Sequence, residues 1–218
     1  MKGWLVFFVL LVVLLASCTT EKTILEKKEK SELAKTEQEQ KETGGEFMGK
    51  VLFIIAQIGY QDKELGTPKE IVENAGYKAE VASLTTDTAS GALGGRLKPD
   101  LAVKDANIDD YDLIVVVGGP GSPELAKHNE VLNLLSQAKE NNKKLGAICL
   151  APMVLAKAGV LQGKRATVFK TSESIAALEQ GGASLEEKDV VVDTDLVTAN
   201  GPGAAQDFGD ELVRLVQG

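Results

Sequence analysis

Three continuous apolar runs dominate the pattern of hydrophobic and polar positions along this chain. They are Lys50–Ala56, Asp112–Val117 and Lys144–Cys149, and almost every residue after the first position of each is apolar. Continuous apolarity over five or six residues is typical of a parallel strand that other elements cover on both faces. The three runs therefore predict the central strands of one buried sheet.

Helical patterns lie between and after these runs. Thr67–Gly76 combines a threonine N-cap, a proline at the first helical position and a terminal glycine. His128–Asn142 and Ala204–Gln217 place apolar residues on one side of a helix. Ser172–Gln180 ends at a glycine pair, and Leu150–Lys157 follows the third apolar run. We expect a helix in each of these five segments.

The remaining strands are expected at Lys78–Leu84, Arg165–Phe169, Asp189–Asp193 and Leu196–Thr198, with a polar, glycine-rich loop or hairpin at Thr85–Leu97. Because strands alternate with helices, the sequence predicts an α/β fold with a mainly parallel sheet. The loops that carry chemistry in such sheets lie beyond the carboxyl ends of the strands. We therefore expect the segments that follow Ala56 and Val117 to meet Cys149 at one edge.

Composition indicates one domain and excludes one class of partner. Residues 48–218 are enough for a single well-packed core. The chain of 218 residues carries a net charge of −8. It has no basic stripe interleaved with aromatic residues, which argues against nucleic acid as a partner.

The first 18 residues follow the pattern of a lipoprotein-type signal peptide. Lys2 provides a positive start, Trp4–Ala16 is apolar but too short to span a bilayer comfortably, and Leu15-Ala-Ser-Cys18 resembles a bacterial lipobox. We expect lipidation of Cys18 and a membrane anchor on the extracytoplasmic side. An uncleaved anchor and an ordinary signal peptide are the alternatives. Residues 19–47 are rich in Lys and Glu, which predicts a flexible charged tether.

Cys149 is the main candidate for chemistry because it stands where a strand ends and a helix begins. The free backbone N–H groups and the helix dipole at such a corner favour negative charge. We therefore expect a lowered thiol pKa and a reactive thiolate. The small residues Gly146, Ala147 and Ala151 permit a sharp turn of the nucleophile-elbow type. A buried structural cysteine is the alternative. With Cys18 lipidated, Cys149 has no disulfide partner.

Two other segments of the same edge can serve this thiol. Gly118-Gly119 follows a strand, and the backbone N–H groups of Gly119 and Leu150 can stabilise an oxyanion. A tight turn alone is the simpler interpretation of the glycine pair. Glu64, after the first strand, can be a protonated acid beside the thiolate or a proton shuttle. Asp62 fits that place equally well on spacing, and either carboxylate can instead be solvated.

Together these segments resemble the ThiJ/PfpI (DJ-one) family, from about Gly49 to the C-terminus. The residues that carry the resemblance are Lys50–Ala56, Asp62–Leu65, Asp112–Gly119, Gly146–Pro152, Ala158–Lys164 and Gly201–Ala204. The resemblance implies a flavodoxin-like sandwich with helices on both faces of the sheet and a cysteine nucleophile elbow. The sandwich is related to class I glutamine amidotransferases, and a homodimer is usual.

The resemblance also implies roles for individual residues. Cys149 is the nucleophile, Glu64 rather than Asp62 is the acid that touches it, and Gly119 and Leu150 are the amide donors. No metal and no organic cofactor is implied.

Two departures from the family pattern limit the reaction. Leu150 stands where protease-like members carry a histidine after the cysteine, and Phe169 occupies the place of a loop histidine in deglycase-like members. The single histidine, His128, begins a predicted helix with no evident route to Cys149. A pair of Cys149 and Glu64 remains, and in the family such a pair suffices for glyoxalase or deglycase chemistry.

The resemblance thus implies a stress-protective enzyme for small reactive carbonyls or glycated substrates. The thiolate adds to an aldehyde, Glu64 moves protons and a hydroxy acid leaves. One alternative is a cysteine redox sensor or chaperone-like protective module, in which Cys149 is oxidised rather than catalytic. Another is a PfpI-type peptidase or amidase, which the missing elbow histidine weakens.

Overall fold

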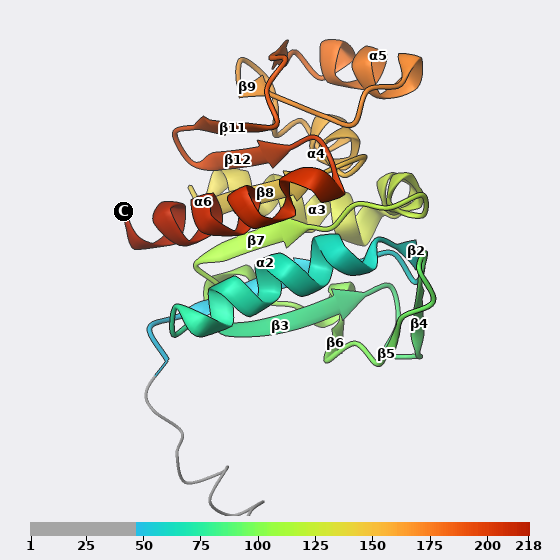
Figure 1. Cartoon of the computed structure of the whole chain (residues 1–218), viewed down its shortest axis with the longest axis vertical. Coiled ribbons are helices and arrows are strands. Elements are labelled where there is room, and N and C mark those ends of the chain that lie inside the picture. The colour runs from blue at the N-terminus through green and yellow to red at the C-terminus, as the bar shows by residue number, and fades with distance from the viewer. Residues whose placement is uncertain (1–46) are drawn as a thin grey trace, which may run out of the picture. The chain divides into compact units, whose positions relative to one another are not determined.

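A seven-stranded sheet forms the centre of residues 47–218, the part of the chain that this computed structural model describes (Figure 1). From one edge to the other its strands are β11 (Val190–Asp193), β12 (Leu196–Ala199), β8 (Lys144–Ile148), β7 (Leu113–Val116), β1 (Lys50–Ile54), β3 (Lys78–Ser83) and β6 (Leu101–Ala102). Neighbouring strands of this sheet run parallel except β11 and β12, which are antiparallel. The predicted α/β fold with a mainly parallel sheet is confirmed.

Helices cover both faces of the sheet, which makes the fold a flavodoxin-like sandwich. They are α2 (Asp62–Asn74) and α6 (Ala205–Gln217) on one face, α3 (Asn129–Glu140) and α4 (Pro152–Lys157) on the other, and α5 (Ser172–Gln180) beside α4 (Figure 1). Val51 and Phe53 of β1 lie in the core under α2 and α6, whereas Leu52 and Ile54 lie in the opposite core. Burial on both faces is the physical cause of the continuous apolar runs.

Two small sheets lie beside the main one. The first contains β2 (Ile58–Tyr60), β4 (Ala89–Gly91) and β5 (Arg96–Leu97), and the second contains β9 (Arg165–Ala166) and β10 (Ser184–Leu185). The hairpin expected within Thr85–Leu97 is confirmed as β4 and β5, whereas β2 was not predicted. The strand predicted at Arg165–Phe169 is shorter than expected. Its last residue instead turns towards Cys149, because the Phe169 N–H donates to the Cys149 carbonyl at 2.9 Å.

The helix predicted at Thr67–Gly76 begins earlier, at Asp62, and this prediction is wrong in its start. Gln61 is the N-cap: its Oε1 accepts hydrogen bonds from the N–H of Lys63 at 2.6 Å and of Glu64 at 3.0 Å. Glutamine is not among the preferred N-cap residues, so the Thr-Pro pair further along misled the prediction. Glu64 therefore lies in the first turn of a helix rather than in a loop.

Within residues 47–218, no helix is both long enough and apolar enough to cross a bilayer. The compact unit begins at Phe47, next to the predicted boundary at residue 48. The predicted signal peptide (residues 1–18) with its predicted lipidation at Cys18 lies outside the described residues. The predicted tether (residues 19–47) also lies outside them, apart from Phe47.

Candidate functional site

Cys149 lies at the corner between β8 and the turn that leads into α4. Its backbone φ is +64°, a left-handed conformation that is uncommon and strained outside glycine. Hydrogen bonds hold the corner from two sides: the Cys149 N–H donates to the Ala199 carbonyl at 2.8 Å, and the Cys149 carbonyl accepts from Phe169. The residue is 8% exposed and its thiol is free. The chain therefore turns sharply at Cys149, as the predicted nucleophile elbow requires.

The Glu64 side chain is buried beside this thiol. Glu64 is fully buried, and neither of its carboxyl oxygens has a hydrogen-bond partner of good geometry. Gly118 lies against both side chains, because a methyl group added there would meet Glu64 Oε2 and lie 2.5 Å from Cys149 Cβ. The absence of a side chain at Gly118 therefore allows the acid and the thiol to approach each other.

Burial changes the proton affinity of Glu64. It raises the pKa of the Glu64 carboxyl from its ordinary value of 4.5 to about 7, because the charged form loses its hydration. The Cys149 thiol and the Gly118 N–H both act in the opposite direction and lower that pKa, but they do not outweigh burial. Around neutral pH, Glu64 is therefore poised between its acid and its carboxylate.

The pKa of the Cys149 thiol shifts in the direction opposite to the one expected from the sequence. Burial, followed by the negative charge of Glu64, raises the pKa of the Cys149 thiol to about 12, while the N–H groups of Gly119 and Leu150 lower it. The sequence argument counted the backbone donors and took Glu64 as a neutral acid, so it omitted the burial of the thiol and the negative charge that Glu64 carries when ionised. Because each acid disfavours ionisation of the other, the pair carries at most one negative charge near neutral pH.

The predicted backbone donors lie where the sequence placed them. The N–H groups of Gly119 and Leu150 lie close enough to the Cys149 thiol to lower its pKa. Gly119 has a φ of +111°, and a side chain there would collide with the backbone of Gly59, Tyr60 and Gln61. The tight turn and the oxyanion donor, the two interpretations of the glycine pair, are therefore compatible, because the turn directs the Gly119 N–H towards the thiol.

Two other candidates face away from Cys149. The Asp62 carboxylate accepts hydrogen bonds from the N–H groups of Leu93 and Gly95, both at 2.7 Å, and so holds the turn between β4 and β5. His128 is the N-cap residue of α3, and its ring lies 3.9 Å from a Glu124 oxygen and 3.6 Å from a Glu130 oxygen. The structure therefore brings Glu64 to the thiol and leaves Asp62 and His128 elsewhere.

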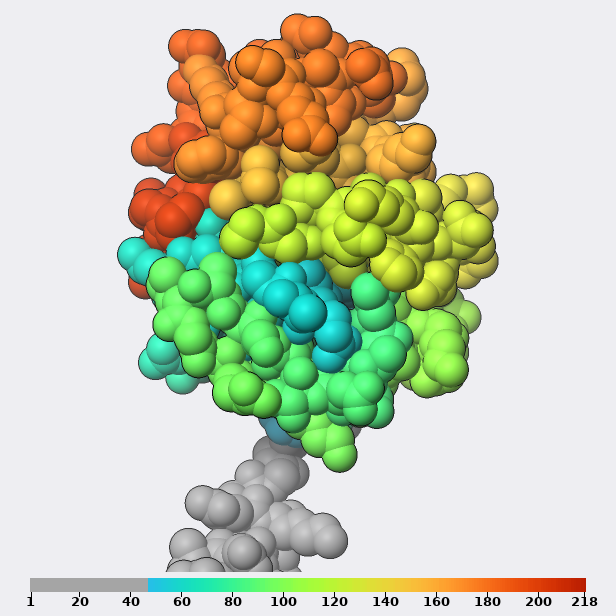
Figure 2. Space-filling view, turned by 90° about the vertical axis from the view of Figure 1, so that its right-hand side faces the viewer, coloured from blue at the N-terminus to red at the C-terminus, as the bar shows by residue number. Residues whose placement is uncertain are grey.

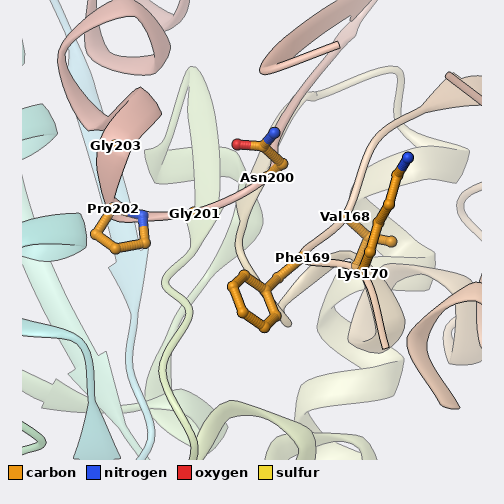
Figure 3. A pocket seen from close by; sticks show the side chains of 7 residues that line it. All are labelled: Val168, Phe169, Lys170, Asn200, Gly201, Pro202 and Gly203. Carbon is orange, nitrogen blue, oxygen red and sulfur yellow. The ribbon is translucent and has the colours of Figure 1, made fainter. Parts of the chain in front are cut away.

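A surface cavity of about 380 Å³ adjoins the Cys149 corner. Its lining residues are Val168, Phe169, Lys170, Asn200, Gly201, Pro202 and Gly203 (Figure 3). Its two walls continue from Phe169 and Ala199, which are hydrogen-bonded to the backbone of Cys149. Lys170 extends away from the Phe169 ring (Figure 3) and pairs with Glu187 at 2.5 Å. Phe169, which the family resemblance sets in the place of a loop histidine, thus lines this cavity.

Two residues of this region were not singled out from the sequence. Gln61 and Asn200 each directly precede a segment that carries the family resemblance, and that adjacency was their only signal. Over residues 47–218, no cluster of three or more His, Cys, Asp or Glu side chains could hold a metal ion.

Known proteins resemble this chain throughout the described domain. A family model described as the DJ-1/PfpI family matches residues 49–215. The glutathione-independent glyoxalase DJR-1.2 of Caenorhabditis elegans is 30% identical over 77% of this chain and 88% of its own length. The deglycase TK1284 of Thermococcus kodakarensis is 31% identical over 76% of this chain and 99% of its own. Among solved structures, a ThiJ/PfpI domain protein from Brachyspira murdochii superposes with a TM-score of 0.74 at 30% identity, covering 77% of this chain and 96% of that one.

Proposed function

Because this chain belongs to the DJ-1/PfpI family, we propose that it is a cysteine-dependent enzyme that acts on small reactive carbonyl compounds. The observation that carries the proposal is the burial of Glu64 beside the Cys149 thiol, with the N–H groups of Gly119 and Leu150 near the same thiol. A relative named as a glyoxalase and another named as a deglycase support the same substrate class. The proposed role is protective, since such carbonyls damage amines and thiols.

The proposed reactive form is a thiolate beside a protonated Glu64. The pair loses its first proton at the pKa near 7 that burial imposes on Glu64, and the remaining charge can reside on either group. The N–H groups of Gly119 and Leu150 lower the pKa of the thiol, although burial and the charge of Glu64 outweigh them while Glu64 is ionised. In the proposal, protonation of Glu64 removes the second of these opposing effects, and the shared charge then resides on the sulfur. Glu64 then holds the proton that the chemistry needs.

The reaction follows from this arrangement for methylglyoxal and water. The thiolate attacks the aldehyde carbon, forming a C–S bond, and Glu64 donates its proton to the resulting oxyanion. The Glu64 carboxylate then removes the hydrogen on that carbon as a proton, and the neighbouring ketone carbon is protonated. The aldehyde carbon is oxidised and the ketone carbon reduced within one molecule. Water cleaves the resulting thioester, which releases lactate and regenerates the thiolate, so no external oxidant or cofactor is consumed.

Turnover of methylglyoxal by the reduced protein tests this function. We expect lactate formation in the wild type, and its loss in both Cys149→Ser and Glu64→Gln. Glu70→Gln is the matched control, because Glu70 is an exposed carboxylate on the same helix. If the wild type turns over methylglyoxal no faster than Cys149→Ser does, the proposed enzymatic activity is refuted. Selective oxidation of Cys149 by peroxide, seen by mass spectrometry without turnover, would favour redox sensing instead.

The rate of Cys149 alkylation shows which group holds the shared charge. If the charge is on sulfur, Glu64→Gln replaces a carboxylic acid donor with a weaker amide donor, and alkylation at pH 7 slows by about tenfold. If the charge is on Glu64, the same substitution removes a negative neighbour and alkylation accelerates. The proposal requires the slower rate.

The apolar side of the adjacent cavity supports a small substrate. Phe169 and Pro202 form two of its walls (Figure 3), and these rings offer contact area without a charge. A peptide substrate is not part of the proposal, because His128 faces Glu124 and Glu130 rather than the thiol.

Location and assembly are further parts of the proposal. The apolar run before Leu15-Ala-Ser-Cys18 supports a lipid-anchored protein on the extracytoplasmic side. In that case the full chain fractionates with membranes and Cys18→Ala does not, whereas equal fractionation of both forms would contradict lipidation. Family membership supports a homodimer, which sedimentation equilibrium would detect as twice the chain mass.

A further inference from the structure

Gln61 occupies a junction between the two halves of the site. Its backbone N–H donates to the Gly118 carbonyl at 2.9 Å, and its side-chain Oε1 accepts from the N–H of Glu64 at 3.0 Å and of Lys63 at 2.6 Å. One residue is therefore bonded both to the glycine loop after β7 and to the helical turn that carries the acid. The proposed reaction of Cys149 and Glu64 assigns no role to Gln61.

The first bond orients the oxyanion donor. The Gly118 carbonyl and the Gly119 N–H belong to the same planar peptide unit. Fixing the carbonyl with the Gln61 N–H therefore fixes the direction in which the Gly119 N–H points, which is towards the Cys149 sulfur. The close approach of Gly119 to the backbone of Gln61 leaves this unit little freedom to rotate.

The second bond holds the acid. The Glu64 N–H is one of the first amides of α2 and has no backbone acceptor within the helix. Its hydrogen bond to Gln61 Oε1 keeps the first turn wound, and the Glu64 side chain makes no hydrogen bond of good geometry that would position it otherwise. The direction of the carboxyl is therefore set by the backbone turn that Gln61 caps.

We propose that Gln61 is a positioning residue that sets Glu64 and the Gly119 N–H in one frame around Cys149, and that its neutral amide caps α2 without adding charge there. The inference rests on the proposed cysteine chemistry. Helix N-caps are commonly Asp, Asn, Ser or Thr. An acidic cap at this position would place a second carboxylate near a pair that already shares one negative charge.

Few other ionisable groups bear on the pair. Within the described residues, the ionisable side chain that shifts the pKa of Glu64 is Cys149, and the one that shifts the pKa of Cys149 is Glu64. Asp62 on α2 faces the β4–β5 turn, and Tyr60 on β2 lies beside Asp62. A charge introduced at position 61 is thus expected to act on a simple two-group system.

Three substitutions in the full-length protein test the inference. Gln61→Glu keeps the cap oxygen and adds a negative charge. We expect it to raise the pH midpoint of Cys149 alkylation by iodoacetamide by about half a pH unit, which makes alkylation at neutral pH about threefold slower. Gln61→Ala removes the cap oxygen, and kcat for methylglyoxal is expected to fall about tenfold with a smaller change in KM. Gln61→Asn keeps a capping amide and is expected to restore most of kcat.

Asn107→Ala is the matched control. Asn107 caps the short helix η2 (Ile108–Asp110), which precedes β7 at the end opposite Gly118. This variant is expected to lower the melting temperature while leaving the alkylation profile and kcat unchanged. If Gln61→Ala and Gln61→Glu likewise change only the melting temperature, the positioning role is refuted. If the wild type itself shows no turnover and a thiol that titrates as in a free peptide, the proposed function fails instead.

Discussion

Cys149 and Glu64 show how burial and hydrogen bonding compete at single side chains. The backbone donors around the thiol favour its ionisation, but burial and the neighbouring carboxylate oppose it more strongly. Neither acid therefore behaves as it would alone, and the useful quantity is the single charge that the two share. A shared charge also explains why a neutral cap such as Gln61 suits this position.

The raised pKa of Glu64 makes stability depend on pH. The pKa rises from 4.5 to about 7 on folding, so the native state binds more protons than the unfolded state between those values. The favourable contribution of neutral Glu64 is complete below pH 4.5 and is lost as pH rises through 7. The Gln side chain in Glu64→Gln cannot ionise. We therefore expect the free energy of unfolding of this variant, relative to that of the wild type, to increase by on the order of 2 kcal/mol between pH 4.5 and pH 7.5.

Urea unfolding at those two pH values measures this difference, with Glu70→Gln as the exposed control. If the difference in unfolding free energy between Glu64→Gln and the wild type stays constant with pH, folding does not raise the pKa of Glu64.

Gly118 gives a second test at the same scale. An added methyl group would collide with Glu64 Oε2 and crowd Cys149 Cβ. We expect Gly118→Ala to lower the free energy of unfolding by about 1–3 kcal/mol and to abolish most turnover. Gly66→Ala is the control, because an added Cβ at this exposed position in α2 has nothing within 4 Å. That change is expected to stabilise the helix by up to about 1 kcal/mol. Equal effects of the two substitutions, followed by thermal melting and turnover, would contradict the crowding argument.

The first turn of α2 combines two separate tasks. Asp62 and Glu64 are two positions apart, which places them about 200° apart around a helix. Asp62 therefore points to the β4–β5 turn, where it accepts from Leu93 and Gly95, while Glu64 points inward to Cys149. The same turn thus anchors a hairpin on one side and supplies the acid on the other.

Removing the outer carboxylate should loosen the hairpin alone. Asp62→Ala leaves the N–H groups of Leu93 and Gly95 without their acceptor, so hydrogen–deuterium exchange of these amides should accelerate. The alkylation profile of Cys149 should stay within about twofold of the wild type, because the Glu64 side chain is unaffected. Alkylation slowed as much as in Glu64→Gln would instead identify Asp62 as the acid of the site.

The whole sheet brings the site together from distant parts of the chain. The carboxyl ends of β1, β7 and β8 lie at one edge, where the segments that follow them meet (Figure 1). Figure 2 shows the molecule from that side, with chain segments from the first, second and last thirds of the domain adjoining on one face. Parallel strands with helical crossovers produce this gathering regardless of which chemistry the loops carry.

Every residue of the proposed mechanism lies within residues 47–218, which form one compact unit. We therefore expect a protein cut to these residues to unfold cooperatively and to keep the kcat of the full-length chain for methylglyoxal. Circular dichroism melting and the lactate assay check both expectations. A folded but inactive fragment would show that residues 1–46 contribute to catalysis as well as to the proposed anchoring.

The sequence by itself determined the layers of the fold and the location of the chemistry. Apolar runs at Lys50–Ala56, Asp112–Val117 and Lys144–Cys149 identify strands buried on both faces, and the order of strands and helices places Cys149 and the glycine pair at one edge. These are local patterns, because burial on two faces leaves a continuous apolar run and a helix start leaves a recognisable cap within a few consecutive residues. The start of α2 left none, since a glutamine cap does not stand out.

Spacing along the chain left open which acid meets the thiol; the family resemblance implied Glu64, and the tertiary structure gives the physical reason and shows what the contact does to the thiol. Asp62 and Glu64 are equivalent in spacing along the chain, and their difference arises when one side of α2 packs against the sheet. The direction of the thiol pKa was also beyond the sequence, because desolvation depends on everything packed around a group rather than on its neighbours in the chain.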